Sequence, residues 1–228
     1  MREGIKVTEE QAAKIERETR GQSQNPRWKE ERKPRVTASR FGEICRATDA
    51  RDLDKLAQDI YDPPNLDHVL SIKHGKLYEQ SAIEAFMAKT EKEVTGCGLF
   101  IDPRFPFLGA SPDGIIKNEN AVVEIKCPYS GRQQMIKPGK HFPFLEVKEG
   151  EPDKYQLKRS HHHYYQVTAE MMLARRSTCY YVVYTLAPDI FVEEIKLDEE
   201  FFTSEMLPKL HEFFEQHYFP ILVANITK

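Results

Sequence analysis

The stretch from residue 98 to residue 126 constrains the fold more than any other part of the sequence. Four short apolar runs in it are separated by turn-forming residues, a pattern that is typical of β-strands. A short polar segment, 117–120, joins the last two runs and predicts a hairpin. The middle of the chain is therefore expected to form a sheet. The four runs are 98–101, 107–110, 115–116 and 121–126.

Segments on both sides of this stretch have the spacing of helices, and two more strands are expected near the C-terminal end. Helices and strands in this order predict an α/β, or α+β, domain with a central mixed β-sheet flanked by helices. The expected helices are 66–90, with a break near Gly75, 164–175, and an amphipathic helix from Asp198 to Phe219; the expected strands are 178–186 and 190–195.

Size and composition are those of one globular domain. The chain has 228 residues, of which 40% are hydrophobic and 30% charged, so it can bury a substantial core. Residues 1–26 are expected to form a helical or flexible arm, and residues 27–228 a single domain. The absence of a membrane-spanning apolar run and of a secretory signal predicts an intracellular protein, with nucleus and cytoplasm both open.

Four cysteines lie far apart in the sequence, and none forms a C-x-x-C pair. Structural zinc sites usually place their ligands at short intervals, so this spacing argues against one. We therefore expect reduced thiols. They are Cys45, Cys97, Cys127 and Cys179.

Two acids and a lysine stand where the predicted strands would bring them together. Side chains alternate along a strand, so Glu124 and Lys126 project to the same side and Ile125 to the opposite side. Asp113 lies across the hairpin from them. Converging carboxylates repel each other unless a cation lies between them, and hard ions such as Mg²⁺ prefer oxygen ligands.

These residues predict a magnesium site made by Asp113 and Glu124, with the backbone carbonyl of Ile125 as a further ligand. Mn²⁺ is expected to substitute for Mg²⁺. A lysine next to such a site can orient an attacking water or stabilise charge on a phosphate, which is the role expected for Lys126. Together these groups are suited to phosphodiester hydrolysis.

Four motifs follow one another along the chain. They are Trp28–Arg32 with Val36–Ser39, His74–Glu79, Pro112-Asp113 with Glu124-Ile-Lys126, and Tyr164-Tyr-Gln166 with Met171. In order and spacing, over roughly residues 27–197, they resemble the phage lambda exonuclease family, also called the YqaJ-type viral recombinase family of PD-(D/E)xK nucleases. The resemblance implies a restriction-endonuclease-like core.

The resemblance also implies roles for individual residues. Asp113 and Glu124 would hold the metal, with Lys126 beside the attacking water. Glu79 would lie near the metal and could complete a second ion site, and Gln166 would hold the water or the lysine. Each of the last two has a structural alternative, Glu79 as a solvated acid and Gln166 as a core amide. The residues matching a site for a terminal 5′-phosphate are Arg32, Ser39 and Ser111, although Ser39 could instead cap a helix.

The function implied is a Mg²⁺-dependent 5′→3′ exonuclease on double-stranded DNA ends, which produces single-stranded tails for recombination or repair. Two alternatives stay open: an endonuclease of the same fold, and a non-catalytic DNA-binding module. The resemblance also implies a single-strand annealing recombinase as partner and a homo-oligomer, since phage members form trimeric rings. No membrane association is expected.

Three further features carry expectations. Residues 27–46 have seven basic residues against three acids, which suggests a phosphate-facing stripe or an ordinary solvated surface. Residues 128–160 lack a clear period and are expected to be a long loop, either a DNA-contacting flap or an insertion that blocks ring contacts. Consecutive residues point in different directions, so His161–His163 is not expected to bind metal. Core positions are expected for Trp28, Phe201, Phe202, Phe213 and Phe214.

Overall fold

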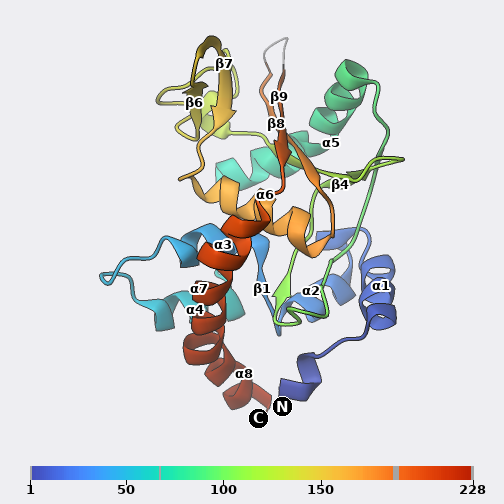
Figure 1. Ribbon diagram of the computed structural model, residues 1–228, viewed down its shortest axis with the longest axis vertical. Helices are drawn as coiled ribbons and strands as arrows, with labels where there is room; N and C mark the ends of the chain where they lie inside the picture. Colours follow the sequence, from blue (N-terminus) through green and yellow to red (C-terminus); the bar gives the residue numbers. More distant parts are fainter. Residues whose placement is uncertain (1, 67, 187–189, 227–228) are drawn as a thin grey trace.

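A mixed sheet lies at the centre of the protein in this computed structural model, which describes residues 2–66, 68–186 and 190–226 (Figure 1). Its strands are β2 (Val94–Thr95), β4 (Gly114–Ile116), β5 (Ala121–Lys126), β8 (Thr178–Tyr184) and β9 (Ile190–Lys196). The strand order is β2-β4-β5-β8-β9; β5 and β8 run parallel, and the other neighbours are antiparallel. The predicted mixed sheet is confirmed.

Helices cover both faces of this sheet. On one face, α5 (Leu70–Thr90) packs Phe86 against apolar side chains that include Ile125. On the other face, α6 (His162–Leu173) packs Val167 against Val122 and its neighbours. Consecutive residues of β5 face opposite layers, as expected for a strand buried on both sides. Because β5 and β8 are parallel, the chain between them must cross over, and α6 is part of that crossover.

A second helical layer packs against α6. It comprises α3 (Ala38–Cys45), α4 (Leu53–Tyr61), α7 (Leu207–Phe213) and α8 (Phe219–Ile226), with wide π-helical turns at Phe201–Met206 and Phe214–Tyr218. Phe202, Phe213 and Phe214 are buried and Phe201 is partly buried, so the prediction that this aromatic group is core is confirmed. The Asp198 carboxylate accepts the Phe201 N–H at 3.0 Å, as expected of a helix cap.

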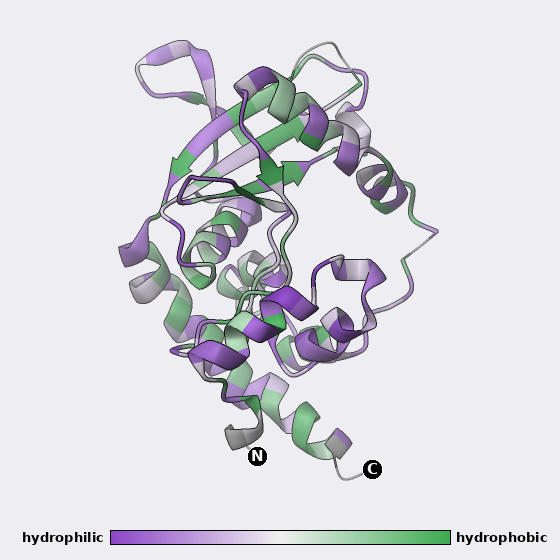
Figure 2. Cartoon of the chain, turned by 90° about the vertical axis from the view of Figure 1, so that its right-hand side faces the viewer, coloured by the Kyte–Doolittle hydropathy of each residue, from purple (hydrophilic) through white to green (hydrophobic). Residues whose placement is uncertain are grey.

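The N-terminal segment packs against the rest of the protein. Its helices are α1 (Glu9–Glu18) and α2 (Pro26–Arg32), and β1 (Val36–Thr37) pairs in parallel with β3 (Leu108–Gly109). Thr19 Oγ1 accepts the Leu99 N–H at 2.8 Å, and Ile15 is buried against Leu99. The first turn of the chain and α8 lie at the same end of the molecule (Figure 2).

Some expected elements differ from the structure. The helix expected over 66–90 begins at Leu70 and continues through Gly75 without a break, because a single glycine lowers helix stability by only about 1 kcal/mol. Asp67, within the expected range, lies outside the described residues. The expected strand 98–101 is reduced to one bridge between Phe100 and Ala110.

The prediction of a long loop over residues 128–160 is wrong for its second half. A hairpin of β6 (Leu145–Lys148) and β7 (Glu151–Leu157) stands beside the end of the central sheet (Figure 1). Most side chains of β7 are exposed or half-buried, so no apolar alternation marks the strand in the sequence. Leu145 and Leu157 are buried and anchor the base of the hairpin.

Two other expectations concern the chain as a whole. All four cysteines are free, which agrees with the expected thiols. Within the described ranges, no helix has the length and apolar character needed to cross a membrane.

Candidate active site

The β4–β5 hairpin sets Asp113 beside Glu124. The Asp113 N–H donates to the Val123 carbonyl at 3.1 Å, and its Oδ2 accepts the Ile125 N–H at 2.7 Å. These two hydrogen bonds hold the Asp113 carboxylate against the backbone of β5. Asp113 and Glu124 are eleven residues apart in the sequence, and the antiparallel pairing of β4 with β5 brings them together. The Ile125 side chain is buried on the opposite face, as expected.

Glu124, Lys126 and Gln166 form a closed hydrogen-bonded triangle. Lys126 Nζ donates to Glu124 Oε1 at 2.5 Å and to Gln166 Oε1 at 3.0 Å. Gln166 Nε2 donates back to Glu124 Oε1 at 2.7 Å. The amide of Gln166 therefore uses both of its ends and can adopt only one orientation. Glu124 is 3% exposed, so this network lies at the base of the site, where it is shielded from water.

Sequence reasoning missed Glu170. It lies one turn after Gln166 on α6, is buried, and accepts a second hydrogen bond from Gln166 Nε2 at 2.8 Å. Its position offers a weak signal in the sequence, because an acid within the apolar run 167–173 must be buried with a polar partner. Among the described residues, Oε2 of Glu124 and Oε2 of Glu170 are buried without a hydrogen-bond partner.

The charges in this site act on one another. Burial, followed by the charges of Glu124 and Glu79, raises the pKa of Asp113 well above its ordinary value. Burial and the charge of Glu124 do the same to the pKa of Glu170. For Lys126, burial acts to lower the pKa, but the surrounding carboxylates outweigh it and the pKa is raised. An excess of buried negative charge of this kind is the environment that a divalent cation relieves.

Glu79 reaches the same region from α5. The residue as a whole is exposed, but its carboxylate lies in a cleft close to other protein atoms. This burial, followed by the charge of Glu124, raises the pKa of Glu79. Glu79 and Asp113 line one cleft of about 580 Å³, together with Gln22 and Lys76. The structure therefore brings together all five residues expected to be catalytic: Glu79, Asp113, Glu124, Lys126 and Gln166.

The residues expected at the 5′-phosphate divide into two places. The Arg32 guanidinium lies 3.9 Å from the centroid of the Trp28 ring and donates to Thr37 Oγ1 at 3.1 Å. Trp28 Nε1 donates to Ser111 Oγ at 2.8 Å, so this indole links the two. Burial lowers the pKa of Arg32 to about 10, which still leaves it charged at neutral pH. Trp28 is only partly buried, against a small apolar cluster.

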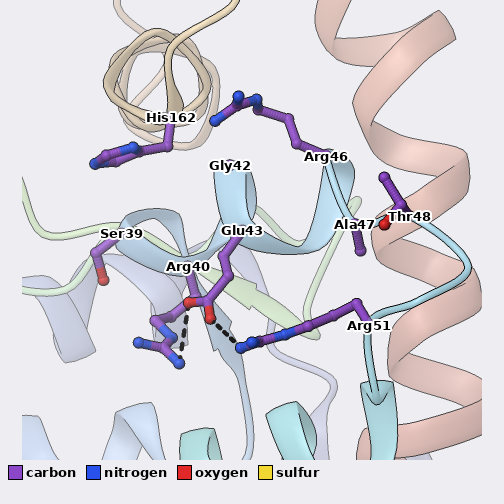
Figure 3. Close-up of a pocket in the computed structure, with 9 residues that line it drawn as sticks. All are labelled: Ser39, Arg40, Gly42, Glu43, Arg46, Ala47, Thr48, Arg51 and His162. Carbon is purple, nitrogen blue, oxygen red and sulfur yellow. Dashed lines mark hydrogen bonds and ion pairs between the residues drawn. The ribbon is translucent and has the colours of Figure 1, made fainter. Parts of the chain in front are cut away.

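Ser39 lines a separate pocket of about 580 Å³ between α3 and the start of α6 (Figure 3). It is exposed in the first turn of α3, and Thr37 occupies the N-cap position without a side-chain capping bond. The cap alternative for Ser39 is therefore wrong. Glu43 pairs with Arg40 at 3.1 Å and with Arg51 at 2.5 Å across this pocket.

The basic residues of 27–46 do not form one continuous stripe. Arg35 is 3% exposed and donates to the Pro106 carbonyl and the Glu31 carbonyl, so it is a core residue. Arg27 pairs with Glu18 and with Glu31. Carboxylates of neighbouring helices therefore neutralise part of the charge excess counted in the sequence.

The side chains of His161–His163 lie closer together than was expected from the sequence. One ligand atom from each of His161, His162 and His163 can be chosen so that all lie within 4.8 Å of one another. The premise that consecutive side chains diverge is wrong here because His161 is the N-cap of α6 and has extended backbone angles. Its ring folds back over the first turn of the helix.

Residues 27–176 match the family model of the YqaJ-like viral recombinase domain. The alkaline nuclease of Orgyia pseudotsugata multicapsid polyhedrosis virus is 29% identical over 198 residues, which cover 78% of this chain and 44% of that nuclease. The chain thus spans less than half of the length of this relative.

Two solved structures share the fold. The alkaline exonuclease LHK-Exo from Laribacter hongkongensis superposes with a TM-score of 0.65 at 22% identity, covering 88% of this chain and 96% of that one. A SOX–DNA complex superposes with a TM-score of 0.60 at 12% identity, covering 91% and 70%. The expected restriction-endonuclease-like core is confirmed by these likenesses.

Proposed function

Because the chain belongs to the YqaJ-like viral recombinase domain family, we propose that it is a divalent-metal-dependent deoxyribonuclease that degrades double-stranded DNA from its 5′ ends. The observation that carries the proposal is the buried network of Glu124, Lys126 and Gln166 next to Asp113. The name of the viral relative, an alkaline nuclease, supports the activity, and the neighbour solved with DNA supports the substrate.

The donor set fits a hard divalent cation. Glu124 Oε2 is buried without a partner, and Asp113 has a raised pKa, so both carboxylates gain from a positive ion. Asp113, Glu124 and the Ile125 carbonyl would hold Mg²⁺ or Mn²⁺, and Glu79 would serve a second ion. The chemistry that such an ion supplies is neutralisation of the charge on the scissile phosphate.

Lys126 would supply a fixed ammonium beside the proposed metal site. Its hydrogen bonds to Glu124 and Gln166 hold the side chain in place before substrate enters, so no reorganisation is needed at the moment of reaction. The raised pKa keeps Lys126 protonated, and the ammonium can orient an attacking water and stabilise the phosphate. Gln166 acts through Lys126 and Glu124 as a positioning residue.

The end of the DNA would be recognised by its phosphate. Arg32 is charged, partly buried and held flat on Trp28, so its guanidinium is preorganised for a phosphate. Ser111 is linked to the same indole, whereas Ser39 would contact the DNA from the neighbouring pocket. A trimeric ring, a recombinase partner and a role in recombination or repair stay predictions of the family resemblance.

The test is digestion of a linear duplex labelled at either end, with and without a 5′-phosphate, in Mg²⁺, Mn²⁺ or EDTA. We expect metal-dependent loss from the 5′ ends, faster with the phosphate, and a reduction of at least a hundredfold in Lys126→Ala. Lys117→Ala is the matched control, because Lys117 is exposed and paired with Glu93 at the surface.

Other outcomes would identify the alternatives. Cleavage of a covalently closed circle, which has no end, would show an endonuclease. Binding of the duplex without turnover in either metal would show a non-catalytic module. Full activity of Lys126→Ala would contradict the proposed site.

A further inference from the structure

The three consecutive histidines at the start of α6 form a compact cluster. The ring centroids of His161 and His162 are 3.9 Å apart, those of His161 and His163 4.4 Å, and those of His162 and His163 4.5 Å. Tetrahedral coordination with bonds of about 2.0–2.1 Å requires nitrogen atoms roughly 3.4 Å apart. With their ligand atoms already within 4.8 Å of one another, small side-chain rotations can reach that separation.

Two of the rings are oriented by groups other than a metal. Nδ1 of His163 lies 2.7 Å from the hydroxyl of Tyr181, a fully buried residue of β8. Nδ1 of His161 accepts the backbone N–H of His163 at 3.3 Å. His163 can donate from Nδ1–H to the Tyr181 hydroxyl, which leaves Nε2 to coordinate, and donation from the non-ligating ring nitrogen is the usual arrangement of metal-ligating histidines. A neutral imidazole that accepts at Nδ1 carries its proton on Nε2, so His161 would bind an ion through Nδ1 in exchange for its 3.3 Å hydrogen bond.

The imidazoles are in the protonation state that coordination needs. Burial, followed by the charges of His162 and Arg46, lowers the pKa of His161 to about 4. Burial and then the charge of Lys126 lower the pKa values of His162 and His163. Neutral imidazole can donate its lone pair, whereas imidazolium cannot.

The surroundings also select among ions. Arg46, Lys158 and Lys126 all face the cluster, so a cation bound only by electrostatic attraction would be repelled. Zn²⁺ and Ni²⁺ form strong bonds to neutral imidazole nitrogen, while Mg²⁺ prefers oxygen. His162 is exposed, which leaves solvent access for a fourth ligand.

We propose that His161, His162 and His163 form a binding site for a transition metal ion of the Zn²⁺ class, separate from the carboxylate site. The cluster lies at the N-terminal end of α6, one turn before Gln166, and His162 lines the pocket that also contains Ser39 and Arg46 (Figure 3). The proposal does not depend on nuclease activity, because it concerns nitrogen ligands that the proposed reaction does not use.

The experiment is isothermal titration of the metal-free protein with Zn²⁺ alone, carried out in the Glu124→Gln background to weaken binding at the carboxylate site. We expect one ion per chain. Adding His162→Ala or His161→Ala should weaken Zn²⁺ binding at least tenfold. Adding His68→Ala, the replacement of another exposed histidine, should leave it unchanged. A large excess of Mg²⁺ should not displace the ion.

Far-ultraviolet circular dichroism of each variant would show that the fold is kept, and His162 is the safest position because its side chain is exposed. A second reading comes from Co²⁺, whose visible absorption changes on tetrahedral coordination; that band should be lost in His162→Ala. Equal Zn²⁺ affinity in the His162 and His68 variants, or the absence of any binding, would overturn the proposal.

Discussion

At the scale of single residues, the candidate site depends on the orientation of one amide. Gln166 Nε2 donates to both Glu124 and Glu170, while Gln166 Oε1 accepts from Lys126. A flipped amide would place its NH₂ group against the ammonium and its oxygen against two carboxylates. We therefore expect Glu170 to be a positioning residue, which holds the Gln166 amide in the orientation that its hydrogen bonds to Lys126 and Glu124 require.

Replacement of Glu170 tests this arrangement. Glu170→Ala leaves Gln166 without one acceptor, and we expect kcat to fall about 10–100-fold with little change in KM for DNA. Glu170→Gln retains an acceptor oxygen and should recover most of the activity. Steady-state kinetics on a linear duplex measures both. Wild-type kcat in Glu170→Ala would show that Gln166 needs no such support.

At the scale of elements, the inserted β6–β7 hairpin is tied to the central sheet by one carboxylate. Glu193 on β9 accepts the Leu157 N–H, at the end of β7, at 2.6 Å. Burial raises the pKa of Glu193 to about 7, against the partial compensation of that hydrogen bond. The junction between hairpin and sheet therefore holds a group that titrates near neutral pH.

This pKa predicts how stability varies with pH. The folded-state pKa lies above the ordinary value of about 4.3, so the folded protein binds this proton more tightly than the unfolded chain. The contribution of Glu193 to stability is complete below pH of about 4.3 and is lost as the pH rises to about 7. Glu193→Gln should remove this dependence, which amounts to roughly 3–4 kcal/mol over the whole range.

Urea unfolding of wild type and Glu193→Gln at pH values from 5 to 8 would measure the pH dependence of the unfolding free energy. Glu194→Gln is the matched control, since Glu194 is the adjacent exposed acid and pairs with Lys196. If the control and Glu193→Gln show the same pH dependence, the carboxylate at the hairpin junction is not the titrating group.

At the scale of the whole molecule, the buried acid cluster opposes folding of the metal-free protein. Asp113 and Glu170 both have raised pKa values in the folded state, so their ionised forms are more costly there than in the unfolded chain. The unfolding free energy of the metal-free protein should therefore fall as pH rises through these raised pKa values. An ion that binds only the folded state reverses part of this loss.

Mg²⁺ should accordingly stabilise the protein. At a concentration about a hundred times its Kd, the gain expected is about 2.7 kcal/mol, seen as a higher Tm. In Asp113→Asn, which removes one ligand charge, the metal-free Tm should be unchanged or higher and the Mg²⁺-induced rise should be lost. Thermal melts with Mg²⁺ and with EDTA test this. A similar Mg²⁺-induced rise in both proteins would place the stabilising ion elsewhere.

Much of the secondary structure, and part of the candidate site, can be predicted from local sequence. A short apolar run and a polar turn are sufficient to predict β5 and its hairpin, because strand pairing over a short loop depends on neighbouring residues. The same local geometry groups Asp113, Glu124 and Lys126. The aromatic residues of the C-terminal helices and the cap at Asp198 are likewise set by side-chain chemistry within one or two turns.

Tertiary structure alone decided the rest. Gln166 meets Glu124 across 42 residues, and the burial that makes Glu170 a partner exists only once α6 is packed on the sheet. The β6–β7 hairpin has no apolar period because most side chains of β7 are exposed or half-buried. Arg35 is a core residue only because the Glu31 carbonyl of α2 and the Pro106 carbonyl of a distant loop meet around it. Ser39 and Arg32 share a sequence motif but line different pockets. The physical reason is the same each time: local propensity sets the direction of a side chain, whereas burial, charge partners and pKa depend on elements brought together by the whole fold.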